Sequence, residues 1–488
     1  MKKQLILIAA LCGAVAAMAD VKADFTKTVR PMRPEIHSSG FGPTICSQTP
    51  DDLAAIKAMG FKAARTHDWA LVNSNQRVCD YFHIFPLMHL DAKDPKNYHF
   101  APTDYLLKRT REETGLDIFY RLGTSIEHSG NVPHFNALIP EDFDKVAEIF
   151  AATVRHYNRG WANGFEWGIK YWEIWNEPDG LMMWCLPDGD EGKGATAEER
   201  KADYEARLAK RRTLFVKFFV KCLKRLKDEF GDTIKVGGPA LVTCDEVWLK
   251  DIFSACRDAG LAPDFISWHG YLRDPAHYVN DAGRARRLCD AYGFTKCELI
   301  VNEWHYIPKG FGWDNFTSSN PVQRSRIWDG PDSLNGIESA CFVLATLANM
   351  EHSELDQAYY YGCRNTGNWG YMDYNTRKRY KVYHALRLFG DIVRDYDTIC
   401  ASVTSGNLYV FAASGDGGQR KGVLVVDYGG ANEVISFDVA GVPANAKASG
   451  LFLDYTHDLV PWPVSFKGGT LTLRKSDRNS AAFFVEFE

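Results

Sequence analysis

The stretch Tyr171-Trp172-Glu173-Ile174-Trp175-Asn176-Glu177-Pro178-Asp179 is the most informative part of this sequence. It predicts a β-strand that Pro178 ends. Asn176 and Glu177 therefore fall at the carboxyl end of that strand. A second stretch, Glu298-Leu299-Ile300-Val301-Asn302-Glu303-Trp304, predicts another strand that ends in a glutamate. Two strands, far apart in the chain, thus each carry a carboxylate at the same kind of position.

Strand-like and helix-like segments alternate on both sides of these stretches, from about residue 34 to residue 393. Such alternation predicts a parallel sheet with crossover helices, and eight units predict a closed (β/α)₈ TIM barrel. The predicted strands are Glu35–Ser38, Phe61–Thr66, Leu116–Gly123, Ile169–Trp175, Thr233–Gly237, Asp264–His269, Glu298–Glu303 and Gln357–Tyr361. The predicted helices begin with one capped by Thr49 and continue with Thr103–Gly115, Pro140–Tyr157, Ala197–Phe230, Asp245–Ala259, Asp281–Ala291, Asp332–Met350 and Arg379–Val393.

The two ends of the chain have a different sequence pattern. Short β-rich runs separated by Gly, Asp and Asn predict a β-sandwich over residues 395–488, to which residues 22–29 are a candidate extra strand. Residues 1–19 have the pattern of a signal peptide, with lysines, a short apolar run and small residues before Asp20. We therefore expect a signal peptide at 1–19, a barrel at 20–394 and a β-sandwich at 395–488, in a secreted or periplasmic protein.

Composition excludes several classes of protein. The 488 residues are 45% hydrophobic and 24% charged, with a net charge of -5 and no basic block, so we expect no nucleic-acid partner. No segment after the signal is apolar enough to predict a membrane span. Of the 12 cysteines, one lies in the signal, and the odd remainder argues against a disulfide framework. No CxxC pair is present, so we expect no structural zinc site.

The two strand-end glutamates indicate a particular chemistry. The carboxyl ends of all barrel strands meet at one mouth, so Glu177 and Glu303 are expected to face each other there. Cleavage of a glycosidic bond with retention needs one carboxylic acid to protonate the leaving oxygen and one carboxylate, about 5 Å away, to attack the anomeric carbon. We assign the acid/base role to Glu177 and the nucleophile to Glu303, whose charge should raise the pKa of Glu177.

The motifs together resemble the clan A glycoside hydrolases, and most closely glycoside hydrolase family 39, which includes β-xylosidases and α-L-iduronidase. Two positions differ from that family: Asn302 stands where Thr is expected, and Asp68 stands where Gly often follows His67. The matching pieces are Arg65-Thr66-His67, residues 172–179, Val236-Gly237-Gly238-Pro239, residues 264–271 and residues 301–304.

The resemblance implies roles for several other residues. Asn176 would bind the sugar 2-hydroxyl, and Arg65 would hold Glu303 ionised. His67, His269 and Tyr271 would line the cleft, although each histidine could instead be a core group. A buried arginine at a strand end needs a carboxylate partner, which favours a role for Arg65. The aromatic residues Trp304, Trp184 and Trp369 fit either sugar platforms or core packing.

We expect no cofactor and no catalytic metal, because His83, His89, His99 and His128 match no ligand spacing. The predicted function is a retaining, β-xylosidase-like glycoside hydrolase that acts on an oligosaccharide or polysaccharide of plant, host or exopolysaccharide origin. The alternatives are another clan A glycosidase, either endo-acting or a uronidase, and a carbohydrate-binding protein without activity. The sequence leaves the sugar, the linkage and the oligomeric state open.

Overall fold

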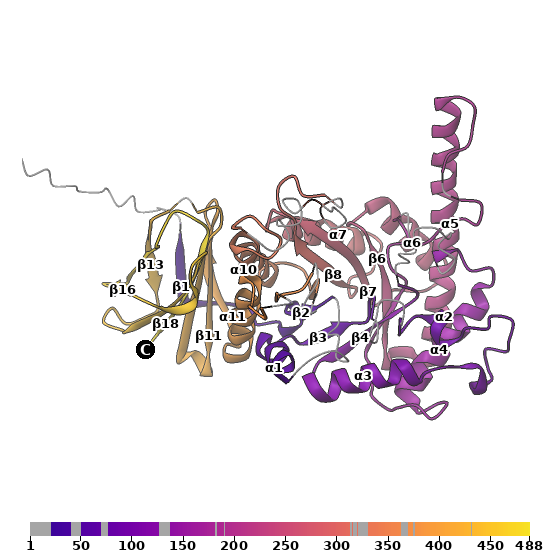
Figure 1. Cartoon of the computed structure of the whole chain (residues 1–488), viewed down its shortest axis with the longest axis horizontal. Coiled ribbons are helices and arrows are strands. Elements are labelled where there is room, and N and C mark those ends of the chain that lie inside the picture. Colours follow the sequence, from indigo (N-terminus) through magenta and orange to yellow (C-terminus); the bar gives the residue numbers. More distant parts are fainter. Residues whose placement is uncertain are drawn as a thin grey trace, which may run out of the picture. The chain divides into compact units, whose positions relative to one another are not determined.

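The computed structural model describes residues 21–40, 50–69, 77–125, 137–180, 183–189, 191–312, 315, 320, 330–362, 369–373, 376–430 and 432–488 (Figure 1). These residues form two compact units. One unit contains residues 32–395, and the other combines the segment that ends at Pro31 with residues 396–488. The predicted signal peptide and the predicted cap Thr49 lie outside the described residues.

Residues 32–395 form a closed barrel of eight parallel strands in chain order, which confirms the predicted fold class. The barrel closes where Ser38 and Ser39 pair with Tyr359 and Tyr360 of the last strand. Parallel neighbours throughout bring all eight carboxyl ends to one mouth. The strands are β2 (Ser38–Ser39), β3 (Ala63–Arg65), β4 (Asp117–Leu122), β5 (Tyr171–Ile174), β6 (Lys235–Leu241), β7 (Phe265–Leu272), β8 (Glu298–Tyr306) and β9 (Gln357–Tyr360).

The first predicted strand is misplaced in the sequence analysis. Residues Pro34–Ile36 form a 3₁₀ turn, and the strand is the pair Ser38–Ser39 that follows it. A proline at the first position of a 3₁₀ turn is well tolerated because its missing N–H would have no helical partner. A strand of two residues carries no alternation for a sequence analysis to detect.

Helices surround the strands on the outside of the barrel (Figure 1). The longest helix, α5, begins at a capping box in which Thr196 and Glu199 exchange side chain–backbone hydrogen bonds. Its first turns stand clear of the barrel in Figure 1. The helices are α1 (Pro50–Met59), the short α2 (Tyr81–Ile84), α3 (Ala101–Thr114), α4 (Phe143–Arg159), α5 (Ala197–Phe230), α6 (Glu246–Asp258), α7 (His277–Ala291), α10 (Ile337–Glu351) and α11 (Lys381–Asp395).

The second unit is a ten-stranded, mostly antiparallel sheet that includes β1, from the amino-terminal part of the chain. The sheet shares one apolar core, to which strands from both of its halves contribute, including Ile435, Phe452 and Phe483. Strands β10, β15 and β16 were not predicted. The strands are β1 (Lys22–Pro31), β10 (Thr398–Val403), β11 (Leu408–Gly415), β12 (Arg420–Asp427), β13 (Val434–Ala440), β14 (Ala448–Leu453), β15 (Asp458–Trp462), β16 (Val464–Lys467), β17 (Thr470–Arg474) and β18 (Ala481–Phe487).

Two further observations bear on the sequence analysis. Among the described residues, no helix has the length and apolarity needed to cross a membrane. The nine described cysteines are all buried free thiols, in keeping with the behaviour of Cys as a small hydrophobic residue.

Candidate active site

Arg65, the last residue of β3, is the centre of the polar network at the barrel mouth. Its side chain is completely buried, and each nitrogen of the guanidinium group donates to a different residue. Nε donates to Glu173 Oε2 at 2.6 Å, Nη1 to Glu303 Oε1 at 2.8 Å, and Nη2 to Asn176 Oδ1 at 2.6 Å. The planar donor fork of arginine suits such a three-way arrangement, which lysine could not reproduce. The expected contact between Arg65 and Glu303 is therefore present in the structure.

Glu173, on β5, is the second carboxylate that Arg65 neutralises. It is fully buried, and its Oε1 atom accepts hydrogen bonds from Ser267 Oγ at 2.6 Å and from Asn302 Nδ2 at 2.5 Å. Together with Arg65, these donors satisfy both oxygens of the buried carboxylate. The network joins β3, β5, β7 and β8 and so fixes the strand ends that carry the candidate catalytic residues.

Glu177 lies in a strained turn just after β5. Trp175 and Glu177 have φ angles of 73° and 44°, which bulky residues adopt only where the surroundings impose them. The turn is attached to the end of β6, because Glu177 N donates to Ala240 O at 2.9 Å. The carboxylate of Asp179 accepts from Val242 N at 3.0 Å in the same region. These bonds hold the Glu177 side chain over the barrel mouth.

Glu303, on β8, receives several donors. Tyr271 Oη donates to Glu303 Oε2 at 2.6 Å, opposite the Arg65 contact to Oε1. His67 Nε2 lies 3.3 Å from Oε1. The residue is 3% exposed, so these donors replace water around its carboxylate. His67 and Tyr271 therefore both lie against the carboxylate of Glu303.

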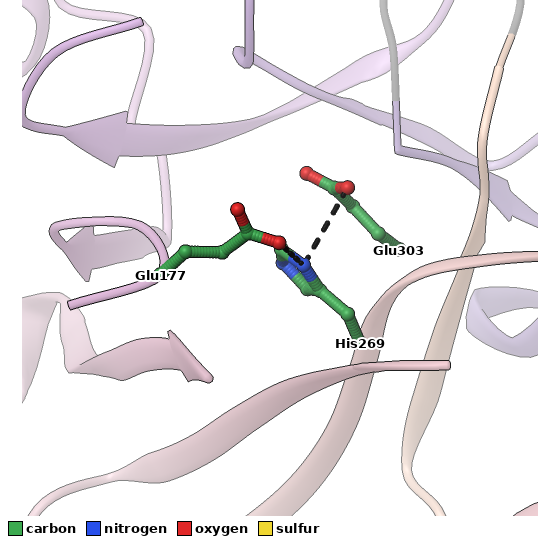
Figure 2. A group of neighbouring side chains, drawn as sticks. All are labelled: Glu177, His269 and Glu303. Carbon is green, nitrogen blue, oxygen red and sulfur yellow. Dashed lines mark hydrogen bonds and ion pairs between the residues drawn. The ribbon is translucent and has the colours of Figure 1, made fainter. Parts of the chain in front are cut away.

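The two glutamates face each other across His269, as Figure 2 shows. An oxygen of Glu177, an oxygen of Glu303 and a ring nitrogen of His269 all lie within 4.8 Å of one another. His269 Nδ1 is 2.8 Å from Glu177 Oε1 and 3.6 Å from Glu303 Oε2. The closest oxygens of the two carboxyl groups therefore lie within 4.8 Å of each other at the barrel mouth.

The electrostatic surroundings of the two carboxylates differ. Burial raises the pKa of Glu177 to about 7, against the opposing effect of Arg65. Burial also raises the pKa of Glu303 above its ordinary value of 4.5, while the charge of Arg65 and the hydrogen bond from Tyr271 lower it. Burial lowers the pKa of His269 to about 4, so this ring is neutral at pH 7. Glu177 therefore faces a neutral imidazole, whereas Glu303 faces a guanidinium.

The raised pKa of Glu177 has a different main cause from the one that the sequence analysis gave. The sequence argument attributed it to the negative charge of Glu303. In the structure, desolvation at the buried end of β5 is the largest contribution. The consequence for chemistry is the same, because a carboxyl group with a pKa near 7 can hold a proton at neutral pH and release it.

The tryptophans proposed as sugar platforms occupy different places. Trp304 and Trp184 are both fully buried, and Trp304 packs against Tyr278, Phe342 and Tyr360. Both therefore act as core residues in the structure. Trp369 is partly exposed, and its ring lies 5.5 Å from that of Tyr271, centroid to centroid. Of the three, Trp369 is the one placed to contact a ligand beside Glu303.

The group Glu177, His269 and Glu303 also has the composition and spacing of a possible metal site. Carboxylate and imidazole ligands suit several divalent cations. The carboxylate of Glu303, however, already accepts hydrogen bonds from Arg65 and Tyr271, and the guanidinium neutralises it. We therefore keep the prediction that no metal takes part, and it is tested below.

Sequence reasoning missed Glu173, Ser267 and Asn302 as parts of this network. The alternation of side chains along a strand could have indicated the role of Glu173, because residues two apart in a strand share a face. Tyr171 packs against the apolar cluster inside the barrel, so Glu173 also points inward, where a carboxylate needs a cation. Asn302 was noted as a departure from the family pattern, and the structure shows that its amide binds Glu173.

Comparisons with known proteins agree with this fold. No family model matches the sequence. A local match of 25% identity over 144 residues joins the chain to a β-xylosidase of Geobacillus stearothermophilus. This match spans 29% of the chain and 23% of the relative, so the chain spans less than a quarter of that protein.

Solved structures match over almost the whole chain. A glucosidase from Croceicoccus marinus has a TM-score of 0.65 at 17% identity, covering 96% of this chain and 98% of its own. A monomeric β-xylosidase from Caulobacter crescentus has a TM-score of 0.60 at 14% identity, with 96% and 99% covered. A family 51 α-L-arabinofuranosidase from Thermotoga petrophila has a TM-score of 0.58 at 13% identity, with 96% and 100% covered. The chain therefore has the fold of the clan A glycoside hydrolases.

Proposed function

We propose that this protein is a retaining glycoside hydrolase in which Glu303 is the nucleophile and Glu177 is the general acid/base. The observation that carries the proposal is the approach of the two carboxylates, whose oxygens lie within 4.8 Å of each other. A short approach of this kind supports a retaining mechanism, in which one carboxylate attacks the anomeric carbon while the other carboxyl group protonates the leaving oxygen.

The proposed reaction has two displacements. In the first, the ionised Glu303 attacks the anomeric carbon while the protonated Glu177 gives its proton to the departing oxygen. In the second, Glu177 removes a proton from water, which attacks the anomeric carbon and releases Glu303. Asn176 supports this role, because its Oδ1 atom is bound to Arg65 while its Nδ2 atom has no partner among the described residues. The free amide N–H groups would donate to a substrate hydroxyl.

The substrate we propose is a glycan of the kind that a β-xylosidase cleaves. The local match to the Geobacillus β-xylosidase and the fold shared with the Caulobacter β-xylosidase support it. The substrate would lie outside the cytoplasm if residues 1–19 act as the predicted signal peptide. A cleft that binds a neutral pentose needs no cation beyond those that hold the catalytic carboxylates.

The test is hydrolysis of a panel of aryl glycosides (xyloside, arabinoside, glucoside, galactoside and uronide), with Glu303→Ala and Glu177→Gln as controls. We expect turnover of the xyloside that disappears in Glu303→Ala. Activity on the uronide in place of the xyloside would reject the proposed substrate while keeping the mechanism. If the protein hydrolyses neither the panel nor xylan but binds glycans, the result would instead favour a carbohydrate-binding protein without activity.

A further inference from the structure

The barrel has a cavity at the end opposite to the glutamates. It has a volume of about 530 Å³ and is lined by the first residues of several strands, including Ala63, Asp117, Tyr171 and Glu298. Because all the strands are parallel, these residues lie at the amino ends of the strands whose carboxyl ends form the candidate active site. The mechanism proposed above uses none of the residues in this cavity.

The inner wall of the cavity is aromatic. Phe119 and Tyr359 belong to the apolar cluster at this end of the barrel, Tyr171 packs against that cluster, and all three line the cavity. Trp167 lies at its outer part and is partly exposed. Aromatic rings next to polar groups are what a sugar contacts with its apolar C–H face and its hydroxyl edge.

The charges around the cavity are balanced. Its cations are Arg33, Lys62, Arg111 and Lys170, and its acids are Glu35, Asp117, Glu298 and Asp356. Some of these already form pairs, such as Lys62 with Asp117 at 2.9 Å and Lys235 with Glu298. Equal numbers of the two signs favour neither an anionic nor a cationic ligand.

Four charged groups of the lining have no ion-pair partner in the part of the chain that the structure describes: Glu35, Arg111, Lys170 and Asp356. The Arg111 guanidinium lies 5.2 Å from the Trp167 ring centroid, and the Lys170 ammonium lies 5.6 Å from that of Tyr171. Glu35 is half-buried on the cavity wall. These groups offer N–H donors and carboxylate acceptors next to aromatic rings, so the site suits a ligand that carries many hydroxyl groups and no net charge.

We propose that this cavity is a second, non-catalytic binding site for a neutral oligosaccharide. The ligand class rests on the proposed function, because a glycosidase meets its glycan as a long chain that can contact more than one site. The volume falls within the range of about 300–1,000 Å³ typical of small-molecule sites. Binding here would hold the polymer on the protein without affecting the chemistry on a short substrate.

The test uses calorimetric titration of the Glu303→Ala protein with three neutral hexasaccharides (xylohexaose, cellohexaose and mannohexaose) and with hexagalacturonate as an acidic probe. We expect at least one neutral probe to bind at two sites. Adding Arg111→Ala should weaken one of the two binding events at least fivefold. Lys108→Ala, which removes an exposed cation from the same helix outside the cavity, should leave both unchanged.

A second variant, Glu35→Gln, keeps the size of the side chain and should also weaken that event. The proposed site is rejected if no neutral probe shows a binding event that Arg111→Ala or Glu35→Gln weakens. The assignment of a neutral ligand is rejected if hexagalacturonate binds at this site more tightly than the neutral probes. The outcome is separable from the proposed activity: Arg111→Ala in the otherwise unchanged enzyme should hydrolyse the aryl glycoside at the normal rate. If neither the wild type nor any variant hydrolyses the aryl glycoside, the proposed enzymatic function is rejected, and the binding result still stands.

Discussion

Replacement of Arg65 by methionine tests the network on which the candidate active site depends. The guanidinium neutralises two buried carboxylates, Glu173 and Glu303, and holds Asn176. Removing one partner of a buried ion pair costs about 3–5 kcal/mol, because the remaining charge stays buried without compensation. We therefore expect Arg65→Met to lower the free energy of unfolding of the barrel by about 3–5 kcal/mol at pH 7.

The size of this effect should depend on pH in a defined direction. Burial raises the pKa of Glu303, and Arg65 is among the groups that lower it, so the variant should hold its proton on Glu303 to a higher pH than the wild type. As the pH falls through the raised pKa of Glu303, the protonated carboxyl group needs no cation, and the destabilisation should shrink. At higher pH the carboxylate must ionise without Arg65, and the destabilisation should be largest.

The assay is urea denaturation followed by tryptophan fluorescence, at pH 5 and at pH 8. Of the 13 tryptophans, Trp462 is the one in the second unit, so the signal reports chiefly on the barrel. Arg65→Lys is the matched control, since it keeps the charge but loses the three-way donor geometry, and it should be less destabilised than Arg65→Met and depend less on pH. Equal stability of Arg65→Met and the wild type at pH 8 would refute the assignment of Arg65 as the counter-charge.

Three further predictions concern activity. Tyr271→Phe removes the phenol that donates to Glu303 at 2.6 Å, and a charge-assisted bond of about 1.5–3 kcal/mol corresponds to a loss of about 10–100-fold in kcat/KM; an unchanged value would argue against this contact. The profile of kcat/KM against pH should fall on its basic side near pH 7, as Glu177 loses its proton, and on its acidic side above pH 4.5, as Glu303 gains one; a profile that stays flat to pH 9 would contradict Glu177 as the acid. Dialysis against a chelator should leave turnover unchanged, whereas a loss that zinc restores would show that Glu177, His269 and Glu303 bind a metal.

Much of the barrel was predictable because several of its strands carry recognisable motifs at their carboxyl ends. The strand before Glu177 and the strand that contains Glu303 were located within a few residues of β5 and β8. The strand Ser38–Ser39 was missed because it is too short to show a pattern, and its pairing with β9 depends on the closure of the whole barrel. Local sequence does not contain that information.

The site was predictable in part for a similar reason. Arg65 ends β3, Glu177 follows β5 and Glu303 lies in the second half of β8, so their convergence follows from the topology of the barrel. The links among Glu173, Ser267 and Asn302 depend on which side chains touch inside the barrel, and that requires the register between strands. The departure at Asp68 also has a local explanation: its φ of 51° lies in the left-handed region, which glycine adopts freely and aspartate tolerates.

The stereochemistry of the first product tests the central claim most directly. Proton NMR of the aryl glycoside that the panel identifies would follow the anomeric signal of the sugar during the first minutes of hydrolysis, before mutarotation. Carboxylate oxygens within 4.8 Å of each other predict that the first sugar released has the same anomeric configuration as the substrate. A first product of the opposite configuration would contradict the double displacement and the assignment of Glu303 as the nucleophile.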